Sequence, residues 1–395
     1  MTRLIFVDDE ARVLDGLRRS MHCMREHWEM RFASSAADAL QQLALEPAEV
    51  VVSDMRMPDM DGAQLLAEVM RLYPGAIRFI LSGQSETESV IRATRSAHRY
   101  LSKPCDAPTL RAAIERASNL KAQLSNDQLA AMVGGLDALP TPPSTYFRLR
   151  ECLDDSESGV ADVVRILRMD VGLTARVVNL ANSGYFGYRE PVQTIERAVS
   201  FVGTEAISSL VLGQELFTSD SPVALPGFSL ERLGQHSFQS AAWARSVALC
   251  EGLSASFADR AFLAGMLHDV GRLVFAARKP PAAEHDRNAW LDETATQMEA
   301  HHDAVGGYLL GLWGFPEAIV EAVLWHHRPS ECRESSLGLC GSIHVGDQLA
   351  HGTDAPAAHS RGLEPGYLES VGLAARWPLW QGLRADSETT SVRAI

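Results

Sequence analysis

The sequence predicts two domains of different fold class, an α/β domain with a five-stranded parallel sheet and helices on both faces, followed by an all-α domain. Short apolar runs alternate with helical patterns over the first 120 residues, whereas helical periodicity alone dominates after about residue 136. Gly134-Gly135 and Leu139-Pro140-Thr141-Pro142-Pro143 mark a boundary between these parts. With 395 residues, 46% of them hydrophobic, the chain is long enough to bury at least two cores.

The five strands predicted for the first domain are short apolar runs, and each is followed by a helical pattern. The strands cover residues 4–7, 31–33, 50–53, 77–81 and 100–101. The helical patterns run through residues 13–21 and then begin at residues 36, 61, 86 and 108. Parallel strands need such crossover helices, so we expect helices on both faces of the sheet.

Three carboxylates should gather at the carboxyl ends of two of these strands. Asp8 and Asp9 follow the first strand, and Asp54 ends the third. Their mutual repulsion favours a hard cation, and Mg²⁺ prefers oxygen ligands and accepts phosphate oxygens. Ser82 and Lys103 also follow strands and offer a hydroxyl and an ammonium group to a phosphoryl group. The alternative, that the acidic residues only cap helices, does not explain this lysine and serine.

Together these motifs resemble the receiver domain of two-component response regulators, a flavodoxin-like fold. The resemblance rests on Asp8-Asp9, Asp54 with Met57-Pro58-Asp59-Met60-Asp61-Gly62, Ser82-Gly83 and Lys103-Pro104. It implies that Asp54 is the phosphoacceptor and that Lys103 pairs with the phosphoryl group. It also implies that Ser82 is the hydroxyl that follows the phosphoryl group and that Tyr100 is the switch aromatic. The implied Mg²⁺ ligands are Asp9, Asp54 and the backbone carbonyl of Arg56, with Asp8 acting through water.

Helical periodicity continues past the end of a receiver-sized unit, through residues 110–124. This pattern fits a signalling helix or the seam of a homodimer, and its first half fits a final helix packed on its own sheet equally well. We expect a receiver domain over residues 1–122, a helical linker over 123–138 and a helical output domain over 139–385. The polar residues 386–395 should form a disordered tail.

The second domain contains ten of the thirteen histidines. His268 and Asp269 lie in the apolar run 261–273, which predicts one buried helix, so both side chains need partners. Candidate partners are His236, His302, His326, His327 and Asp347. Imidazoles with carboxylates suit Fe, Mn, Zn or Ni, which could activate water against a phosphate ester. Alternatively, the same side chains form a dry hydrogen-bond network that fixes the bundle.

The remaining histidines of this domain are expected to be structural. His285, His301 and His344 are interpreted as core residues with satisfied hydrogen bonds. His351 and His359 are interpreted as surface-loop residues.

The order of these residues resembles the HD superfamily of metal-dependent phosphohydrolases, and more closely its regulatory HDOD branch. The HDOD resemblance rests on Leu139 to Pro143, Met169 to Ala175, Leu180 to Ser183, Thr194 to Gly203, Gly265 to Arg272, Gly311 to Pro316 and Trp325-His326-His327. It implies a non-catalytic signalling module. This chain nevertheless keeps a histidine or aspartate at every ligand position. It lacks the Gly-Tyr-Pro motif of the related cyclic di-GMP phosphodiesterases, and Arg272 replaces their lysine.

Charge and cysteine usage limit the partners and the compartment. Residues 1–120 carry 17 acidic and 15 basic side chains, which leaves 33 and 21 for the rest of the chain. This acidic second part disfavours nucleic acid as a partner. Six cysteines without a CxxC pair indicate free thiols in a reducing compartment. Since no signal peptide or run of about 18 apolar residues is present, we expect a cytoplasmic protein without membrane contact.

The leading hypothesis is a response regulator phosphorylated on Asp54 by a sensor histidine kinase or a phosphotransfer protein. Its HDOD module would then act through contacts with a downstream protein. The competing hypothesis is a phosphorylation-controlled, metal-dependent phosphohydrolase acting on a nucleotide or cyclic dinucleotide. A transcription factor is disfavoured because the acidic second domain shows no basic recognition helix.

Overall fold

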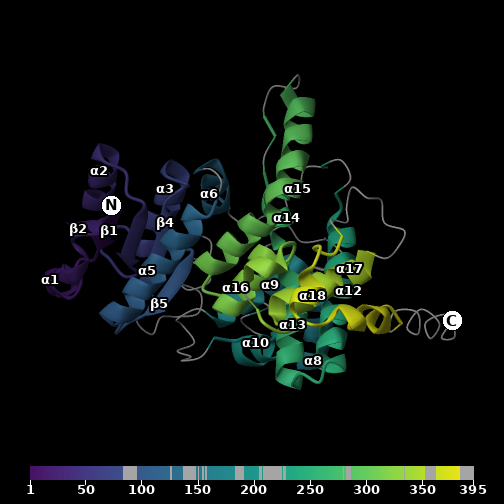
Figure 1. The fold of residues 1–395 in the computed structure, drawn as a ribbon. Helices are drawn as coiled ribbons and strands as arrows, with labels where there is room; N and C mark the ends of the chain where they lie inside the picture. Colours follow the sequence, from purple (N-terminus) through teal and green to yellow (C-terminus); the bar gives the residue numbers. More distant parts are fainter. Residues whose placement is uncertain are drawn as a thin grey trace.

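A computed structural model places an α/β domain beside a helical domain (Figure 1). The structure describes residues 1–82, 96–124, 127–136, 148–149, 151–153, 155, 158–182, 191–203, 207, 225, 228–278, 280–281, 286–332, 334–351 and 362–382. The predicted helix from residue 86 and the predicted tail over 386–395 lie outside these residues.

The first domain is built on a five-stranded parallel sheet, which confirms the predicted fold class. Its strands are β1 (Thr2–Val7), β2 (Trp28–Ala33), β3 (Val50–Asp54), β4 (Ile77–Ser82) and β5 (Arg99–Ser102). The strand order is β2-β1-β3-β4-β5. Val7 pairs with Ser53 in the register of β1 and β3, so Asp8 and Asp54 follow at neighbouring positions. The carboxyl ends of β1 and β3 therefore deliver two carboxylates to the same edge of the sheet.

Helices follow the strands of this sheet. They are α1 (Ala11–Ser20), the 3₁₀ turn η1 (His22–Met24), α2 (Ala36–Leu45), α3 (Gly62–Leu72) and α5 (Ala107–Ala122). Asp61 and Gln64 form a capping box that fixes the start of α3. A Cβ atom on Gly62 would lie 2.1 Å from the Asp54 carbonyl oxygen. Only glycine therefore lets α3 begin so close to the end of β3.

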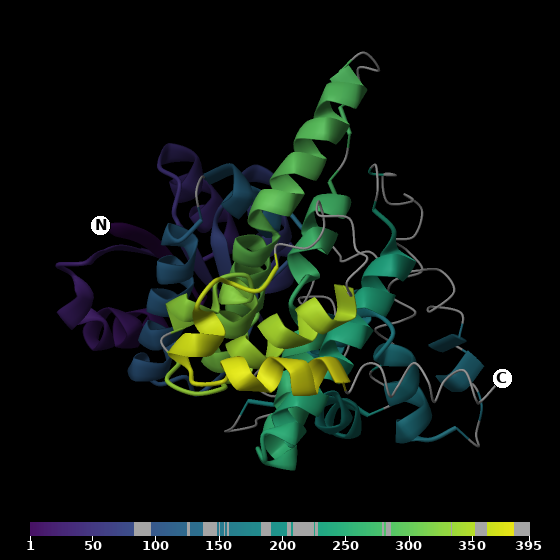
Figure 2. The same ribbon diagram turned by 45° about the vertical axis from the view of Figure 1, so that its right-hand side comes forward.

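The second domain is a helical bundle. It contains α8 (Val160–Leu167), α9 (Val171–Ala181), α10 (Ile195–Val202), α12 (Leu230–Cys250), α13 (Ala255–Leu267), α14 (Val270–Ala276), α15 (Arg287–Leu312), α16 (Glu317–Trp325), η4 (Pro329–Cys332), α17 (Leu339–His351), α18 (Tyr367–Ser370) and η5 (Ala374–Arg376). Helix α12 packs along both α13 and α17, and α14 packs on α15. The amino-terminal half of α15 extends beyond the other helices of the bundle (Figure 2).

The prediction of one continuous helix over residues 261–273 is wrong. The apolar run 261–273 forms two helices, since α13 ends at Leu267 and α14 begins at Val270. His268 is the C-cap of α13 and Asp269 the N-cap of α14. Apolar residues fill both helices without a break, so the pattern gave no sign of this junction. The junction lets the two neighbouring side chains reach the same buried site.

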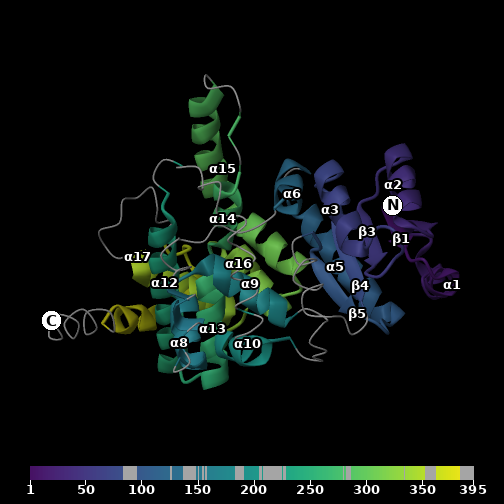
Figure 3. The same cartoon turned by 180° about the vertical axis from the view of Figure 1, so that it is seen from behind.

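The two domains meet where α5 and α6 (Asp127–Gly134) contact α15, as Figure 3 shows from behind. Nη2 of Arg116 donates a hydrogen bond of 2.8 Å to the carbonyl oxygen of Phe315. Leu120 packs into the space that Gly311 leaves, because a Cβ atom there would lie 2.0 Å from its Cδ1. Arg99 passes close to Gly314, which has a φ of 76°. Two of the HDOD-like glycines thus serve this contact between domains.

Two of the interpretations of the 110–124 pattern are compatible with this packing. Leu110, Ile114 and Ala117 are buried in the core, as expected for a final helix on its own sheet. The next turn, with Arg116 and Leu120, contacts the helical domain, as expected for a signalling helix. A homodimer seam stays a prediction.

Asp170 gives the helical domain a pH-dependent stability. Its side chain is 2% exposed and caps α9, because Oδ1 accepts a hydrogen bond of 2.9 Å from the Leu173 N–H. Its Oδ2 is buried without a hydrogen bond. Burial raises the pKa of Asp170 from 3.8 to about 7, although the Leu173 N–H acts in the opposite direction.

At this side chain the native state should therefore bind more protons than the unfolded chain between about pH 4 and pH 7. We expect the contribution of Asp170 to the free energy of unfolding, measured as the difference between the wild type and Asp170→Asn, to fall by about 2 kcal/mol between about pH 5 and pH 8. Asp170→Asn keeps the cap without the charge, so its urea-unfolding midpoint should lose this slope. Asp162→Asn, at the more exposed start of α8, is the matched control and should keep the slope. Parallel slopes for the wild type and Asp170→Asn would contradict the prediction.

Candidate functional site

The first candidate site lies at the carboxyl edge of the sheet. Asp8 is 1% exposed and Asp54 is 8% exposed, whereas Asp9 is exposed at the rim. Nζ of Lys103 donates a hydrogen bond of 2.8 Å to Oδ2 of Asp8 and forms an ion pair with Oδ1 of Asp54. The structure therefore brings together Asp8, Asp54 and Lys103 from three different strand ends.

The three charged side chains of this site shift one another's pKa values. Burial raises the pKa of Asp54, as does the nearby carboxylate of Asp8, while Lys103 acts to lower it. Burial acts to lower the pKa of Lys103, but its contacts with Asp54 and Asp8 outweigh burial and raise it. Oδ2 of Asp54 accepts a hydrogen bond of 3.0 Å from the backbone N–H of Arg56. The single positive charge of Lys103 thus offsets only part of the negative charge of the two buried carboxylates.

The other residues predicted for this site are placed less completely. Ser82 is the last residue of β4 and Tyr100 lies in β5, but their side chains are outside the described part of the structure. The side chain of Arg56 is exposed, next to Asp54 in the chain. The Lys103-Pro104 peptide bond is cis. The carboxylate oxygens of Asp8, Asp9 and Asp54 are the type of ligand that Mg²⁺ prefers.

The second candidate site is a buried group of histidines and aspartates in the bundle, here called the histidine cluster. Its members come from α12, the α13–α14 junction, α15, the end of α16 and α17. They are His236, His268, Asp269, His302, His326, His327, Asp347 and His351. All seven residues predicted as ligands are therefore brought together. Only two pairs of them, His268-Asp269 and His326-His327, are neighbours in the chain.

Two carboxylates lie among the imidazoles of the cluster. Oδ1 of Asp269 lies 3.2 Å from Nε2 of His302. Oδ1 of Asp347 lies 2.9 Å from Nε2 of His236. Nε2 of His268 lies 3.6 Å from Oδ2 of Asp269 and 3.6 Å from Oδ1 of Asp347. Thus His268 sits between the two carboxylates.

Backbone hydrogen bonds orient three of the rings. Nδ1 of His268, His302 and His326 lies 2.7, 2.9 and 2.7 Å from the carbonyl oxygens of Gly265, Met298 and Val323. A carbonyl oxygen can only accept, so each Nδ1 carries the hydrogen. Nε2 then offers its lone pair to the cluster whenever the ring is neutral, the arrangement that favours metal binding.

Burial keeps three of the rings neutral. It lowers the pKa of His302 and His327, and it lowers that of His326 to about 4. His268 behaves differently, because the carboxylates of Asp269 and Asp347 outweigh its burial and raise its pKa to about 9. Without a metal ion, a protonated His268 therefore neutralises part of the carboxylate charge.

Several ligand atoms of the cluster are buried without a hydrogen bond. They are Oδ1 of Asp269, Oδ1 of Asp347 and Nε2 of His326. Oδ1 of Asp269 lies 3.2 Å from a nitrogen of His302, and Oδ1 of Asp347 lies 2.9 Å from a nitrogen of His236. Such atoms are costly to bury unless another group binds them. The donor set of imidazoles and carboxylates therefore fits a divalent transition metal.

An arginine already occupies one side of the cluster. Nε of Arg272 lies 3.0 Å from Oδ2 of Asp269, and its guanidinium group pairs with Glu299 of α15. Sequence reasoning missed Glu299, although it lies three residues before His302 and therefore on the same face of α15. Arg272 thus links Asp269 to Glu299 across two helices.

The interpretation of His351 as a surface-loop residue is wrong. His351 is the last residue of α17, and its Nδ1 lies 3.2 Å from Oδ1 of Asp347. The spacing of four residues from Asp347 could have revealed this contact, since such residues share a helix face. His344 is buried, with Nδ1 2.7 Å from the carbonyl oxygen of His326 and Nε2 accepting a hydrogen bond from the Glu364 N–H. Its interpretation as a satisfied core residue is confirmed, whereas His285 and His359 lie outside the described residues.

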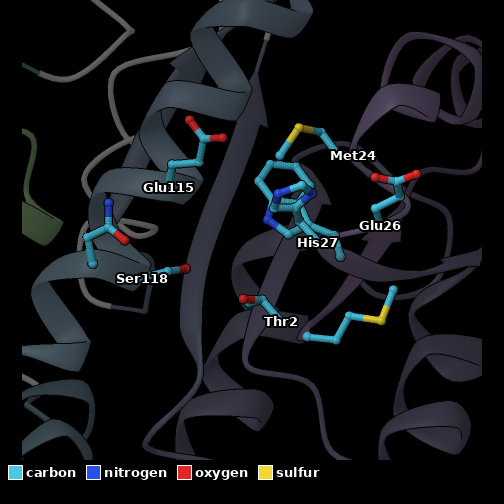
Figure 4. Close-up of a pocket in the computed structure, with 9 residues that line it drawn as sticks. Thr2, Met24, Glu26, His27, Glu115 and Ser118 are labelled. Atoms are coloured by element: carbon cyan, nitrogen blue, oxygen red, sulfur yellow. The ribbon is translucent and has the colours of Figure 1, made fainter.

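A hollow on the receiver-like domain lies apart from both candidate sites (Figure 4). It has a volume of about 520 Å³ and is lined by Met1, Thr2, Met24, Glu26, His27, Trp28, Glu115, Ser118 and Asn119. Thr2 begins β1, whereas Asp8 follows its other end. The hollow is thus at the opposite end of the strand from the buried carboxylates.

Among the described residues, we also find no helix of the length and apolarity needed to cross a membrane.

Comparison with known proteins assigns both parts of the chain. A response regulator receiver domain matches residues 4–115, and an HDOD domain matches residues 139–329. An uncharacterized protein of Treponema pallidum is 24% identical over 237 residues, which cover 57% of this chain and 45% of that protein. The hydrogenase transcriptional regulatory protein HoxA of Cupriavidus necator is 34% identical over 103 residues, which cover 26% of this chain and 21% of HoxA. The chain thus spans less than half the length of these relatives.

Two solved structures are also similar to parts of the chain. The signal receiver domain of an HD domain-containing protein from Pseudomonas fluorescens Pf-5 is 30% identical, with a TM-score of 0.30, and the match covers 31% of this chain and 98% of that structure. The MmoQ response regulator from Methylococcus capsulatus is 22% identical, with a TM-score of 0.46, and the match covers 62% of this chain and 98% of that structure. From the order of the two family matches, the chain belongs to the response regulators that join an N-terminal receiver domain to a C-terminal HDOD domain.

Proposed function

We propose that Asp54 accepts a phosphoryl group from a sensor histidine kinase or a phosphotransfer protein, and that the receiver domain then changes how the HDOD domain contacts a downstream protein. One observation carries this proposal. Strand β5 ends just before Lys103, which contacts Asp54, and begins at Arg99, which contacts Gly314 of the HDOD domain. A single short strand therefore links the phosphoacceptor to the neighbouring domain.

The chemistry follows from the contacts of Asp54. One carboxylate oxygen would attack the phosphorus atom and form the new P–O bond as the donor's bond to phosphorus breaks. When bound, Mg²⁺ supplies charge neutralisation for the phosphate oxygens, and Asp8, Asp9, Asp54 and the Arg56 carbonyl are the residues proposed to hold it. The product carries a charge of roughly −1.5 to −2 and three acceptor oxygens. Lys103 would redistribute its contacts from Asp8 toward these oxygens, and Ser82 is the proposed hydroxyl donor.

The contact between domains offers a path for this change. Arg116 and Leu120 of α5 hold the end of α15 through Phe315 and Gly311. Burial lowers the pKa of Arg116, while the carboxylates of α16 act to raise it. The guanidinium group of Arg116 is therefore partly buried in the contact between the two domains. Helix α15 runs without a break from Arg287 to Leu312 and also carries His302 of the histidine cluster. A shift at its end can therefore reach the cluster.

The first test is phosphorylation itself. We expect acetyl phosphate to label the wild type in the presence of Mg²⁺ and to leave Asp54→Asn unlabelled, because the acceptor oxygen is replaced by an amide. Asp59→Asn is the control, since Asp59 is exposed with a φ of 64° that asparagine tolerates. Undiminished labelling of Asp54→Asn would refute the assignment.

The second test concerns the path between domains. Hydrogen exchange of residues 305–316, the last turns of α15 and the four residues after them, should change by about 5-fold or more when the wild type is phosphorylated. Leu120→Ala empties the space beside Gly311, so the change should shrink although Asp54 is still labelled. Leu45→Ala is the control, because Leu45 is 83% exposed at the end of α2. Identical exchange of this segment with and without phosphorylation would argue against domain coupling through α15.

A second candidate function is a metal-dependent phosphohydrolase acting on a nucleotide or cyclic dinucleotide. It is favoured by the buried ligand atoms without hydrogen bonds in the histidine cluster. The histidines would hold the metal, and the bound metal would supply an activated water molecule. However, Arg272, which replaces the lysine of related phosphodiesterases, is already paired with Asp269 and Glu299. A signalling module is therefore preferred over an enzyme.

The metal content of the purified protein tests the second candidate function, the metal-dependent phosphohydrolase. We expect purified wild type to contain iron, manganese, zinc or nickel by elemental mass spectrometry, with at least a 10-fold loss in His268→Ala. His301→Ala, next to a cluster member on α15, should keep the metal. Equal metal in the wild type and His268→Ala would contradict a specific site. No metal in either would leave the cluster as a hydrogen-bond network.

A further inference from the structure

Two cysteine side chains of the helical domain contact each other. Cys332 ends η4, and Cys340 lies in the first turn of α17. Both are free thiols, and the Cys340 thiol donates a hydrogen bond to the sulfur of Cys332. We propose that Cys332 and Cys340 form a reversible redox pair, which a hydroperoxide converts into a disulfide that ties η4 to α17. This inference does not depend on the proposed function, because both thiols belong to the helical domain and Asp54 to the receiver domain.

Contacts on both sides of η4 hold Cys332 in place. The η4 turn packs on α16 and α17. Sγ of Cys332 donates a hydrogen bond of 3.8 Å to the carbonyl oxygen of Glu321 in α16. The N–H and Oγ of Ser330 donate hydrogen bonds of 3.0 and 2.5 Å to the carboxylate of Glu364. Because the Cys332 thiol is held in contact with Cys340, a small movement of the two side chains brings the sulfur atoms to bonding distance.

Glu334 fixes the start of α17 and therefore the position of Cys340. Its carboxylate accepts a hydrogen bond of 3.3 Å from the N–H of Gly341. A Cβ atom on Gly338 would lie 1.9 Å from Oε1 of Glu334, so the turn before α17 closes tightly around this carboxylate. Burial raises the pKa of Glu334, while the N–H groups of Gly341, Cys340 and Gly338 act to lower it. The carboxylate thus caps the first turn of α17 at the residues next to the thiol.

The two thiols differ in their access to solvent. Cys332 is partly exposed, whereas Cys340 is 1% exposed. Burial raises the pKa of Cys340 well above its usual value, and the hydrogen bond to Cys332 raises it further. Cys332 is therefore the thiol that meets an oxidant first, and Cys340 is the second thiol. An accessible cysteine beside a second one that can displace its oxidised product is the arrangement found in redox-sensing sites.

A buried hydroxyl beside the pair has no partner among the described residues. Tyr367 is 2% exposed, and its Oη lacks a hydrogen bond. A Cβ atom on Gly341 would lie 2.0 Å from this Oη, so the hydroxyl sits over the residue that follows Cys340. Burial raises the pKa of Tyr367, and the negative charges of Glu334, Cys340 and Cys332 would add to this. The tyrosine thus stays protonated and offers a donor to an oxygen atom that oxidation adds at the pair.

Oxidation by hydrogen peroxide takes place in two steps. The Cys332 thiolate attacks one peroxide oxygen, so that an S–O bond forms as the O–O bond breaks, and the leaving hydroxide takes up a proton to become water. The sulfur of Cys340 then attacks the sulfur of the Cys332 sulfenic acid. An S–S bond forms as the S–O bond breaks, and the leaving hydroxide takes the Cys340 proton and becomes a second water. The thiols together lose two electrons, the peroxide gains them, and a dithiol reverses the product by exchange.

The disulfide would join two segments that flank the histidine cluster. Segment η4 begins two residues after His327, and α17 carries Asp347. A covalent link between η4 and α17 reduces the freedom of both segments. Oxidation would therefore give the helical domain an input that is separate from phosphorylation of the receiver domain.

The experiment uses the full chain, which is first reduced and then exposed to hydrogen peroxide. Peptide mass mapping of the wild type should find a peptide pair that joins Cys332 to Cys340 and that dithiothreitol separates. A maleimide should then label two thiols fewer than the six of the reduced chain. Cys250→Ser is the matched control, because Cys250 is also partly exposed in the helical domain. This variant should form the same cross-link.

Two variants assign the order of the steps. In Cys340→Ser, dimedone should trap a sulfenic acid on Cys332, because no second thiol is present to displace its oxygen. In Cys332→Ser, the buried Cys340 should stay unmodified at the same peroxide concentration. Mapping of the wild type needs neither variant, so the test stands even if Cys340→Ser does not fold.

Hydrogen exchange tests the effect of the cross-link on the fold. Residues 330–332 and 339–342 should exchange about 5-fold more slowly in the oxidised wild type and at unchanged rates in peroxide-treated Cys332→Ser. A wild type without the Cys332–Cys340 peptide pair, or with Cys332 joined to the same residue of a second chain, overturns the inference. A cross-link that leaves the exchange unchanged overturns the proposed restriction of η4 and α17. Labelling of Asp54 is measured separately, so none of these outcomes is confused with failure of the proposed function.

Discussion

Both sites of this protein depend on the neutralisation of buried carboxylates. In the receiver domain, Asp8 and Asp54 are held together by the ammonium group of Lys103. In the HDOD domain, Arg272 pairs with Asp269, and a protonated His268 lies between Asp269 and Asp347. Buried charge without such partners would be strongly destabilising. Any added charge, whether a phosphoryl group or a metal ion, must therefore rearrange the existing pairs, which makes each site responsive.

Close approach of backbones, made possible by glycine, determines where these charges lie. Gly62 lets α3 begin beside the Asp54 carbonyl, and Gly346 lets α17 approach α12 next to Asp347. At the contact between domains, Gly311 accommodates Leu120 and Gly314 lies beside Arg99. A side chain at any of these positions would push apart the elements that carry functional groups. The glycines therefore act on the sites through the packing of the backbone.

The same helix serves both domains of the molecule. Helix α15 ends at the contact with α5 and carries Glu299 and His302 within it. Glu299 pairs with Arg272, which in turn contacts Asp269 at the α13–α14 junction. A continuous chain of packed and charged groups thus joins the receiver domain to the histidine cluster. Such a chain makes energetic coupling between the sites physically reasonable, and the coupling must then act in both directions.

The sequence by itself determined the two fold classes, the strand ends that carry Asp8, Asp54 and Lys103, and the seven residues predicted as ligands. These features follow from local patterns, because apolar periodicity and side-chain chemistry are visible along the chain. Tertiary structure alone decided the helix break at His268-Asp269 and the pairing of Glu299 with Arg272. Both depend on how the helices around the histidine cluster pack against one another. Uniformly apolar helices carry no local signal for such contacts.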